Sequence, residues 1–509
     1  MACDMRVRDA RWEQLENSSF DVVVIGGGIT GASTFASLAA AGYKVLLIDR
    51  GDFGSATSQS SGMMIWGGLL YLKNLDLNTV FRLCRIRDRL IEEFPDEIGA
   101  QYYGYLPART GWRTPAVIRL VLEFYRLIAG YRRGRVRAES AFPEAQFLRM
   151  EQFRGSLFYE EAMLTASDSL LVVNIIRRHA SATAVPMNYA RLDDVAFDRQ
   201  QHRWRVALAD TFADHAVTLS ARSIVNCGGA YADAINRQYG ISTPYRHALS
   251  KGVYINLKRP DGHDHPLIFE LGRAGDVLTF VPWGPVSLWG PTETLIDDVN
   301  AGFAPSLADV EFLLAQANRN LNYRVTARDI ISYRAGVRAL AVPADYHAQR
   351  YPLELSRRYR VHLAKAIPWV TVYGGKLTSG ELMGGRVLQE LRGVLGPAPS
   401  TPQRPDSLPP VHDRMRFPGL AGSWPSIAHC VRHEYCLTIE DYLRRRTNIA
   451  QWLPRSGLGR ENENRDLIQR LTAELPLRSG VRPAIIVDRL IAEADRVQTQ
   501  IYGLNGAGT

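Results

Sequence analysis

The sequence contains little cysteine and no arrangement of cysteines that is typical of a zinc site. Five cysteines occur among 509 residues, and none of them lies in a C-x-x-C pair. An odd number without paired spacing predicts neither a disulfide framework nor a metal centre. We therefore expect reduced thiols, a cytoplasmic protein and no bound metal ion.

The sequence also lacks long apolar runs and repeats. No stretch of about 18 uninterrupted apolar residues occurs, and residues 1–14 have no apolar core of the kind found in signal peptides. We therefore expect a chain that does not cross a membrane. The one biased segment is 396–410, which contains six prolines and is expected to be a linker.

What is present is an ordinary globular composition with an excess of positive charge. Hydrophobic residues make up 46% of the chain and charged residues 22%, and the length predicts two or three domains. The 61 Lys and Arg residues against 52 Asp and Glu give a net charge of +9. Such an excess can attract anionic lipid or an anionic substrate, or reflect a basic surface without a partner. A nucleic-acid partner is not expected.

Residues 20–61 contain the pattern around which the rest of the chain is expected to be arranged. In order, they hold an apolar run at 22–25, then Gly26, Gly28 and Gly31 in G-x-G-x-x-G spacing, a helical segment, an apolar run at 45–48 and Asp49. Gly26 permits a tight turn, Gly28 lets the backbone approach a pyrophosphate, and Gly31 lets the helix pack on the strand. Asp49 can accept hydrogen bonds from a ribose. The alternative is a glycine-rich turn in another α/β unit, but this context is the one that a dinucleotide site requires.

The residues after Asp49 favour FAD over NAD. NAD enzymes usually continue into another strand and helix. Here a hydroxyl-rich loop at 55–61 leads instead into a Gly-Gly turn at 67–68. Such a loop suits a backbone that wraps around an extended FAD.

At this point the sequence resembles a known family. Residues 20–72 are similar to the N-terminal signature of FAD-dependent glycerol-3-phosphate dehydrogenases, within the larger group of D-amino-acid oxidase and glycine oxidase flavoproteins. Residues 224–230 resemble the second FAD contact of the family, with a ligand-free strand end as the alternative, and 333–338 and 370–378 also match. The resemblance implies that FAD is the cofactor. It assigns to FAD binding Gly26, Gly28, Ile29, Thr30, Gly31, Asp49, Arg50, Ala56, Thr57, Ser58, Ser61, Gly228, Gly374, Gly375, Lys376, Leu377 and Thr378.

The resemblance also implies an α/β fold with interleaved domains. We expect a Rossmann-like FAD-binding domain of the glutathione-reductase type, a substrate domain with an antiparallel sheet, and a helical C-terminal domain. The expected ranges are 18–92, 166–242 and 335–395 for the FAD-binding domain, 93–165 and 243–334 for the substrate domain, 396–411 for the linker and 412–509 for the C-terminal domain.

The same resemblance places Tyr254, Arg338 and Lys376 at the catalytic site. Arg338 matches a family arginine that binds the anionic end of the substrate, a role that suits a planar guanidinium. Lys376 matches a position near substrate and flavin, with an exposed lysine at a helix start as the alternative. Tyr254 stands where the family has an active-site histidine.

Other positions depart from the family pattern and predict a remodelled substrate pocket. Three positions that are positive or ionisable in the family are Met63, Trp66 and Leu70 in this chain. We expect these residues and Met64 to form an apolar wall. Losing one charged partner of a buried phosphate costs about 2 to 5 kcal/mol. The pocket is therefore expected to favour a substrate that is less anionic than glycerol 3-phosphate.

The sequence thus predicts an FAD-dependent oxidoreductase that transfers hydride from a CH–OH or CH–NH bond to the flavin, with quinone or O2 as the electron acceptor. Oxidation of glycerol 3-phosphate is the first alternative, because a shifted alignment or charge from Arg334 or Lys251 would restore a phosphate site. An amine or amino-acid oxidase is the second alternative, and a flavin-binding protein without catalysis is the third. The sequence leaves the oligomeric state open.

A basic segment at 109–137 carries eight arginines and one acid around an apolar middle. One interpretation is an interfacial helix that makes peripheral contact with an anionic membrane. The other is a core-facing helix with a solvated basic flank. The sequence favours neither of the two.

Overall fold

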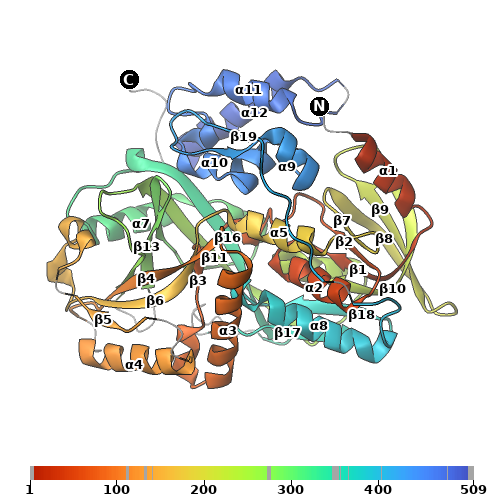
Figure 1. Cartoon of the computed structure of the whole chain (residues 1–509), viewed down its shortest axis with the longest axis horizontal. Helices are drawn as coiled ribbons and strands as arrows, with labels where there is room; N and C mark the ends of the chain where they lie inside the picture. Colours follow the sequence, from red (N-terminus) through yellow and green to blue (C-terminus); the bar gives the residue numbers. More distant parts are fainter. Residues whose placement is uncertain are drawn as a thin grey trace.

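The computed structural model describes residues 5–110, 114–130, 134–139, 141–271, 277–346, 355, 357–364, 366–402, 404–478 and 480–501 (Figure 1). Its α-helices are α1 (Met5–Leu15), α2 (Ile29–Ala41), α3 (Leu77–Glu93), α4 (Pro115–Ile128), α5 (Asp168–His179), α6 (Ala232–Gln238), α7 (Leu307–Asn320), α8 (Gly380–Leu395), α9 (Ile427–His433), α10 (Ile449–Trp452), α11 (Arg465–Ala473) and α12 (Pro483–Arg496). Shorter turns near the site are η1 (Thr57–Gln59), η2 (Leu69–Asn74), η9 (Leu377–Ser379) and the π-helix η10 (Asp441–Arg446).

The strands fall into two large sheets and one small one. They are β1 (Ser19–Ile25), β2 (Val45–Ile48), β3 (Met64–Ile65), β4 (Ile98–Leu106), β5 (Arg137–Ala138), β6 (Leu157–Leu164), β7 (Ala184–Met187), β8 (Ala190–Asp198), β9 (Arg203–Asp210), β10 (Ala216–Asn226), β11 (Tyr245–Lys258), β12 (Leu267–Glu270), β13 (Val277–Trp283), β14 (Val286–Gly290), β15 (Thr294–Ile296), β16 (Ile330–Pro343), β17 (Arg360–Ala364), β18 (Trp369–Tyr373), β19 (Arg414–Met415) and β20 (Trp424–Pro425).

The first sheet is built around the glycine motif. Its strand order is β17-β18-β10-β1-β2-β7, and the hairpin of β8 and β9 is attached to β10. Strand β1 runs parallel to its neighbours β2 and β10, as β2 does to β7 and β10 to β18. Helices α2, α5 and α8 pack against this sheet (Figure 1). The glycine turn therefore lies at the carboxyl end of a central parallel strand, where α/β sheets bind ligands.

Side chains of β1 alternate between two hydrophobic cores. Val22 and Val24 contribute to the core beneath α2, α5 and α8. Val23 and Ile25 contribute to a second core with Trp204 of β9. Because a central parallel strand is buried on both faces, its sequence is a continuous apolar run. This explains why the sequence shows an unbroken run at 22–25.

The second sheet is mostly antiparallel. Its strand order is β15-β11-β14-β13-β12-β4-β6-β3, with β16 paired to β11 and β5 paired to β6. The pairing of β11 with β16 places Ser250 opposite Arg338 and Tyr254 opposite Arg334. The two sheets and the C-terminal helices confirm the predicted α/β fold class.

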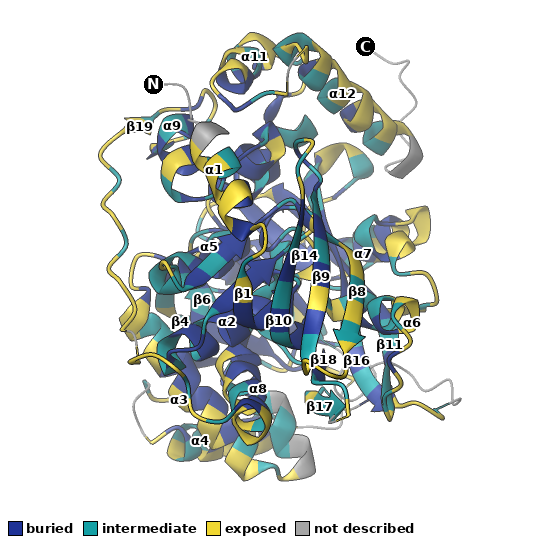
Figure 2. Ribbon diagram, turned by 90° about the vertical axis from the view of Figure 1, so that its right-hand side faces the viewer, coloured by how far each residue is buried: buried dark blue, intermediate teal, exposed yellow. Residues whose placement is uncertain are grey.

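The C-terminal helices form a core of their own. Residues of α9, α10, α11 and α12 pack together with Phe417 and Trp424. Figure 1 shows these helices above the two sheets, and Figure 2 shows exposed outer faces on α11 and α12 while β1 and α2 lie buried inside the molecule.

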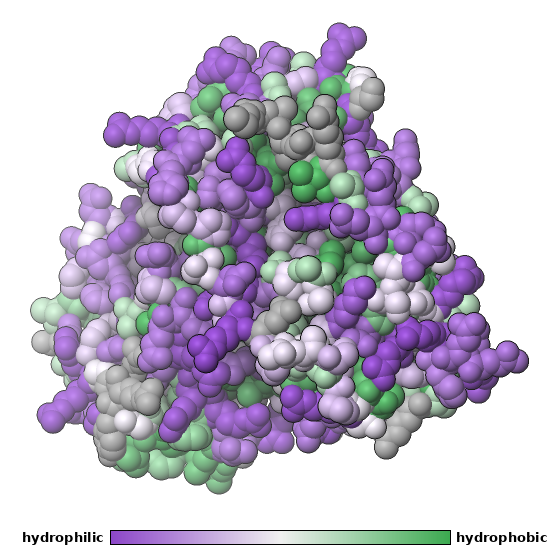
Figure 3. Space-filling model, turned by 45° about the vertical axis from the view of Figure 1, so that its right-hand side comes forward, coloured by the Kyte–Doolittle hydropathy of each residue, from purple (hydrophilic) through white to green (hydrophobic). Residues whose placement is uncertain are grey.

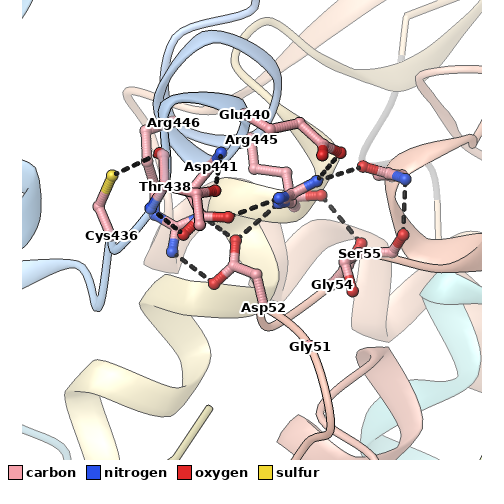
Figure 4. A network of polar contacts seen from close by, with 12 residues as sticks. Gly51, Asp52, Gly54, Ser55, Cys436, Thr438, Glu440, Asp441, Arg445 and Arg446 are labelled. Atoms are coloured by element: carbon pink, nitrogen blue, oxygen red, sulfur yellow. Dashed lines mark hydrogen bonds and ion pairs between the residues drawn. The ribbon is translucent and has the colours of Figure 1, made fainter. Parts of the chain in front are cut away.

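A buried ion cluster joins the C-terminal helices to the loop after β2 (Figure 4). Asp52 Oδ2 accepts hydrogen bonds from Arg445 Nε and Arg446 Nη1, each at 2.7 Å, and its Oδ1 accepts from Arg446 Nη2 at 2.9 Å. Arg445 also donates to Asp441 Oδ1 at 2.5 Å and to Gln59 Oε1 at 3.2 Å. Gln59 belongs to the hydroxyl-rich loop, so η10 holds this loop directly.

Two strands depart from the predicted domain boundaries. β16 continues to Pro343 within the second sheet, so residues 335–343 lie in that sheet although they fall in the range predicted for the FAD-binding domain. β3 also joins the second sheet, although it lies within 18–92. Alternating apolar residues predict a strand but not the sheet that it joins. The remaining division into domains stays a prediction.

Three features of the described residues concern thiols, metals and membranes. Cys84, Cys227, Cys430 and Cys436 are buried and unpaired, and Cys3 lies outside the described residues. Burial raises the pKa of the Cys227 thiol to about 12. In the part of the chain that the structure describes, no three His, Cys, Asp or Glu side chains gather as metal ligands. No described helix is both long and apolar enough to cross a bilayer.

Candidate active site

The glycine turn between β1 and α2 is closely packed. Gly26 has a φ of +96°, and a Cβ added to it would lie 2.6 Å from the Cys227 carbonyl oxygen. A Cβ on Gly31 would lie 1.7 Å from the Gly26 carbonyl oxygen. Both positions therefore require glycine, one for its left-handed backbone and both for close approach. Gly28 is the N-cap of α2.

Asp49 lies at the end of β2, where its carboxylate faces the cavity described below. Its Oδ2 accepts a hydrogen bond from Gly27 N at 2.7 Å, and its Oδ1 accepts one from Gly51 N at 2.9 Å. Burial raises the pKa of Asp49 to about 6, against the lowering effect of these two hydrogen bonds. Each oxygen keeps one lone pair, which can accept a ribose hydroxyl.

The hydroxyl-rich loop closes over the glycine turn. Ser58 Oγ accepts a hydrogen bond from Ile29 N at 3.0 Å, at the first turn of α2. Thr57 Oγ1 donates to the Val337 carbonyl oxygen at 2.8 Å on β16. The loop thus connects the glycine motif of the first sheet with the long strand of the second.

A large cavity extends from the glycine turn to the second sheet. Its volume is about 1340 Å³, whereas a typical small-molecule pocket holds roughly 300–1,000 Å³. Gly28, Ile29 and Thr30 at the start of α2 line it, where backbone N–H groups and the helix dipole favour phosphate. With Asp49 for a ribose and glycines that leave space for a pyrophosphate, the lining fits FAD and leaves room for a substrate.

At the second sheet, the cavity contains a cluster of opposite charges. Glu293 Oε2 lies 3.1 Å from Arg338 Nη1 and 3.4 Å from Arg357 Nη2. A Cβ on Gly252 would lie 2.3 Å from both Nη atoms of Arg338, so the guanidinium rests on a glycine of the neighbouring strand. Burial lowers the pKa of Arg357, with Glu293 acting in the opposite direction. The cluster can bind an anionic group of a ligand.

Tyr254 lies buried beside this cluster. Its ring fits against Gly290, where a Cβ would lie 2.9 Å from Tyr254 Cδ1, and its hydroxyl would meet a Cβ on Gly62 at 2.3 Å. Burial raises the pKa of Tyr254, against the lowering effect of Arg338. The phenol is therefore neutral at physiological pH and can donate a hydrogen bond into the cavity.

Lys376 follows the glycine pair at the end of β18. It lines the cavity, and its Nζ lies 4.5 Å from the centre of the Tyr71 ring. Burial and the charge of Arg357 lower the pKa of Lys376 to about 7. A lysine with this pKa can lose its proton near neutrality and then accept one from a substrate.

A family model described as "FAD dependent oxidoreductase" matches residues 21–374. The chain belongs to this family. FAD is accordingly its cofactor, which confirms the prediction from the glycine motif and the loop at 55–61.

Similar proteins agree with this assignment. The oxidoreductase is 26% identical to an "Aerobic glycerol-3-phosphate dehydrogenase" of Staphylococcus aureus (strain USA300) over 387 residues, which are 74% of this chain and 68% of the relative. It shares its fold with the FAD complex of a glycerol-3-phosphate dehydrogenase from Bacillus halodurans, at a TM-score of 0.72, 17% identity and 98% coverage of both chains. A glycine oxidase from Geobacillus kaustophilus shares 16% identity over 74% of this chain and 95% of its own, at a TM-score of 0.52.

Most residues predicted for the oxidoreductase site line the cavity. They are Gly26, Gly28, Ile29, Thr30, Asp49, Arg50, Ala56, Thr57, Ser58, Ser61, Met64, Trp66, Gly228, Tyr254, Arg338, Gly374, Gly375, Lys376, Leu377 and Thr378. Gly31 lies behind the turn, against Gly26. Met63 is a correction, because its side chain is fully buried in a core with Ile65 and does not line the cavity. Met63 precedes β3 and has a left-handed backbone with a φ of 61°, whereas Met64 begins the strand and lines the cavity. Leu70 lies in η2, and its side chain is outside the described part.

The alternative sources of positive charge are already paired. Lys251 Nζ lies 2.5 Å from Asp309 Oδ2. Arg334 forms an ion pair with Asp168 and lies over the Trp283 ring, with its guanidinium carbon 4.9 Å from the ring centre. Neither Lys251 nor Arg334 lines the cavity, so neither of them supplies positive charge to a ligand there.

Sequence reasoning missed Arg357 and Glu293. Arg357 follows no motif, and the sequence contains 61 basic residues among which it does not stand out. Glu293 precedes β15 in a polar turn with no distinguishing pattern. The signal that could have found Glu293 is the pairing of β15 with β11, which only the folded sheet provides.

Proposed function

We propose that this FAD-dependent oxidoreductase oxidises a CH–OH or CH–NH bond in a substrate with one anionic group and an apolar body. The observation that carries the proposal is the composition of the cavity at the second sheet. Arg338 and Arg357 share Glu293 there, while Met64 and Trp66 line the same space. Leu271, Val277, Phe303 and Phe312 extend the apolar lining.

Each polar residue of the cluster has a separate task in this proposal. The arginines hold the anionic group, because a guanidinium donates two parallel hydrogen bonds to a carboxylate or phosphate. Tyr254 donates a hydrogen bond to the substrate oxygen or nitrogen, and Lys376 accepts the proton that this substrate atom loses. Bound FAD supplies the hydride acceptor, and quinone or O2 then takes the electrons. Consumption of O2 during turnover separates these two acceptors.

The test is the rate at which candidate substrates bleach the flavin absorbance band under anaerobic conditions. Apolar hydroxy and amino acids should bleach it faster than glycerol 3-phosphate, and Arg338→Ala should slow the reaction by weakening substrate binding. Efficient bleaching by micromolar glycerol 3-phosphate would refute the apolar-body proposal.

Glycerol 3-phosphate remains the second candidate substrate. The printed names of the Staphylococcus and Bacillus relatives favour it. Arg357 favours it as well, because this residue adds a second arginine to the one expected from the sequence. The bleaching experiment decides between the two candidates.

The proposed role of Lys376 predicts a pH dependence. Since its pKa is about 7 and only the neutral amine accepts a proton, the rate of flavin reduction should rise with pH through about 7 and then level off. Lys376→Met should remove this rise and lower the rate by about 100-fold or more, the usual contribution of a general base. Stopped-flow absorbance measures both effects. Lys258→Met, which replaces an exposed lysine on β11, serves as the control, and an unchanged pH profile in Lys376→Met would disprove the role.

We further propose that α4 attaches a cytoplasmic protein to the surface of an anionic membrane. Ile118, Leu122 and Tyr125 of this helix are buried. Its outer face exposes an apolar stripe that consists of Val117, Leu120, Val121, Phe124 and Leu127. In Figure 3, apolar side chains gather at the lower edge of the molecule, where Figure 1 shows α4.

Charged residues beside the stripe favour anionic lipid over an apolar protein partner. Arg119 on α4 and Arg82 and Arg85 on the neighbouring helix α3 are exposed, and the guanidinium carbon of Arg85 lies 4.8 Å from the centre of the Phe81 ring. A helix with an apolar face and flanking arginines is typical of interfacial binding. Each arginine near an anionic surface contributes about 1 kcal/mol.

Sedimentation with anionic vesicles tests this surface. The protein should co-sediment at low salt and dissociate as salt rises. Leu120→Glu should lower the bound fraction about tenfold, because the apolar side chain that it removes stabilises binding by about 1.5 kcal/mol or more when buried. Ile485→Glu is the matched control, since Ile485 is also exposed and its helix, α12, lies at the other end of the molecule from α4 (Figure 1). Equal sedimentation of both variants would exclude α4 as the contact.

A further inference from the structure

Glu293 occupies the centre of the charged cluster. Its Oε1 accepts a hydrogen bond from Ser250 Oγ at 2.6 Å, and its Oε2 faces both Arg338 and Arg357. The side chain is 10% exposed and lines the cavity. A carboxylate in this position is directly accessible to an anionic group that enters the cluster.

Three adjacent strands fix this arrangement. β11 lies between β15 and β16, with Ser250 opposite Arg338 on β16 and Lys251 opposite Thr294 on β15. Glu293 directly precedes Thr294, so its side chain reaches across β11 toward Arg338. The Thr292 carbonyl oxygen accepts from Arg338 Nη1 at 3.5 Å. The cluster is therefore built on paired strands rather than on an isolated loop.

The charges of the cluster leave a small positive excess. Arg338 and Arg357 contribute two positive charges, and Glu293 removes one. Lys376 adds only a partial charge, because its pKa of about 7 leaves much of it neutral at physiological pH. A bound monoanion therefore neutralises the site, whereas a dianion leaves an additional negative charge near Glu293.

We propose that Glu293 sets the charge of the ligand that the site accepts, favouring a carboxylate over a phosphate dianion. The proposal rests on the proposed function only for the location of the anion site. Removing this one negative charge, without changing side-chain size, is expected to reverse the preference.

The first test uses the wild-type protein with bound FAD. Acetate and methyl phosphate carry the same methyl group, but at pH 8 methyl phosphate is a dianion, since the second pKa of a phosphate monoester is about 6. Each anion is titrated while the flavin absorbance spectrum is followed, which requires no turnover. Acetate should bind more tightly, and equal or tighter binding of methyl phosphate would overturn the proposal.

The second test repeats both titrations with Glu293→Gln. Glutamine can still accept the hydrogen bond from Ser250, but it lacks the charge. The ratio of methyl phosphate to acetate affinity should rise about tenfold or more, since unit charges about 4 Å apart interact by several kcal/mol at the dielectric of a protein surface. An unchanged ratio would show that Glu293 only holds the arginines in place, and would overturn the proposal.

Asp193→Asn is the matched control. Asp193 also lines the cavity but lies on β8 of the first sheet, away from the cluster, so the ratio should stay at its wild-type value. If neither anion perturbs the flavin spectrum of any of these proteins, the anion site that the proposed function assumes is wrong. The inference about Glu293 is then wrong as well. If Glu293→Gln does not retain FAD, the wild-type titrations decide alone.

Discussion

Gly28→Leu is expected to abolish FAD binding while leaving the chain folded. Gly28 lines the cavity at the start of α2 and has an ordinary φ of −76°, so leucine causes no backbone strain. A Cβ at this position would lie 3.2 Å from Ser58 Oγ, and the rest of the side chain would occupy the space above the helix N-terminus. A pyrophosphate needs that space to reach the backbone N–H groups.

The measurement is the flavin absorbance of the purified variant after incubation with excess FAD. We expect a colourless protein whose far-ultraviolet circular dichroism matches that of the wild type, with FAD affinity lowered at least about 100-fold, or roughly 2.7 kcal/mol. Gly385→Leu is the control, because Gly385 is an exposed glycine of α8 with open space around it. A yellow Gly28→Leu protein would place the pyrophosphate elsewhere.

Asp52→Asn is expected to lower the free energy of unfolding by about 3 to 5 kcal/mol, the usual cost of removing one partner from a buried ion pair. The Asp52 and Arg446 side chains are fully buried. Arg446 also donates hydrogen bonds to the Glu434 carbonyl oxygen, from Nε at 2.9 Å and from Nη2 at 2.7 Å. These two bonds remain when the Asp52 carboxylate is removed, but the positive charge of Arg446 then lacks its buried partner. The contact between η10 and the hydroxyl-rich loop should loosen, so FAD affinity should also fall.

Urea unfolding followed by circular dichroism measures the loss. Asp488→Asn is the control, since Asp488 forms an exposed ion pair with Arg465 and should cost about 1 kcal/mol or less. Burial raises the pKa of Asp52, but Arg446 and Arg445 more than offset this and hold it below its usual value. The contribution of Asp52 is therefore present above the unfolded pKa of about 3.9 and disappears as pH falls through the lower folded value. Equal stability of the two variants would contradict a coupling role for Asp52.

The basic segment at 109–137 shows what a sequence pattern alone can predict about a helix. The sequence allowed α4 to face either a membrane or the core. The structure shows one face packed inside, with Leu122 and Tyr125, and another face exposed, with Leu120 and Phe124. Helical spacing identifies two faces, but only the packed neighbours decide which of them remains uncovered.

The charged cluster at the second sheet shows the same limit of sequence patterns. The sequence predicted Arg338 as the single anchor, because a motif surrounds it. Arg357 and Glu293 reach the same cavity from segments without a motif. Met63 and Met64 are adjacent and chemically identical, yet the structure buries one and exposes the other to the cavity. The residue type at a position therefore does not tell whether its side chain lines the cavity, because this depends on the direction in which the side chain points.

By itself, the sequence determined the α/β fold and the FAD cofactor, which the glycine motif predicted. These follow from local rules, since a tight turn, a helix start and an acid at a strand end depend on residues within about 20 positions of one another. Only the tertiary structure decided the charge of the cluster at the second sheet, the ion pair of Asp52 with Arg446 and the exposed face of α4. These depend on residues up to 394 positions apart, and burial and pairing over such separations are set by how sheets and helices pack, which no local pattern records.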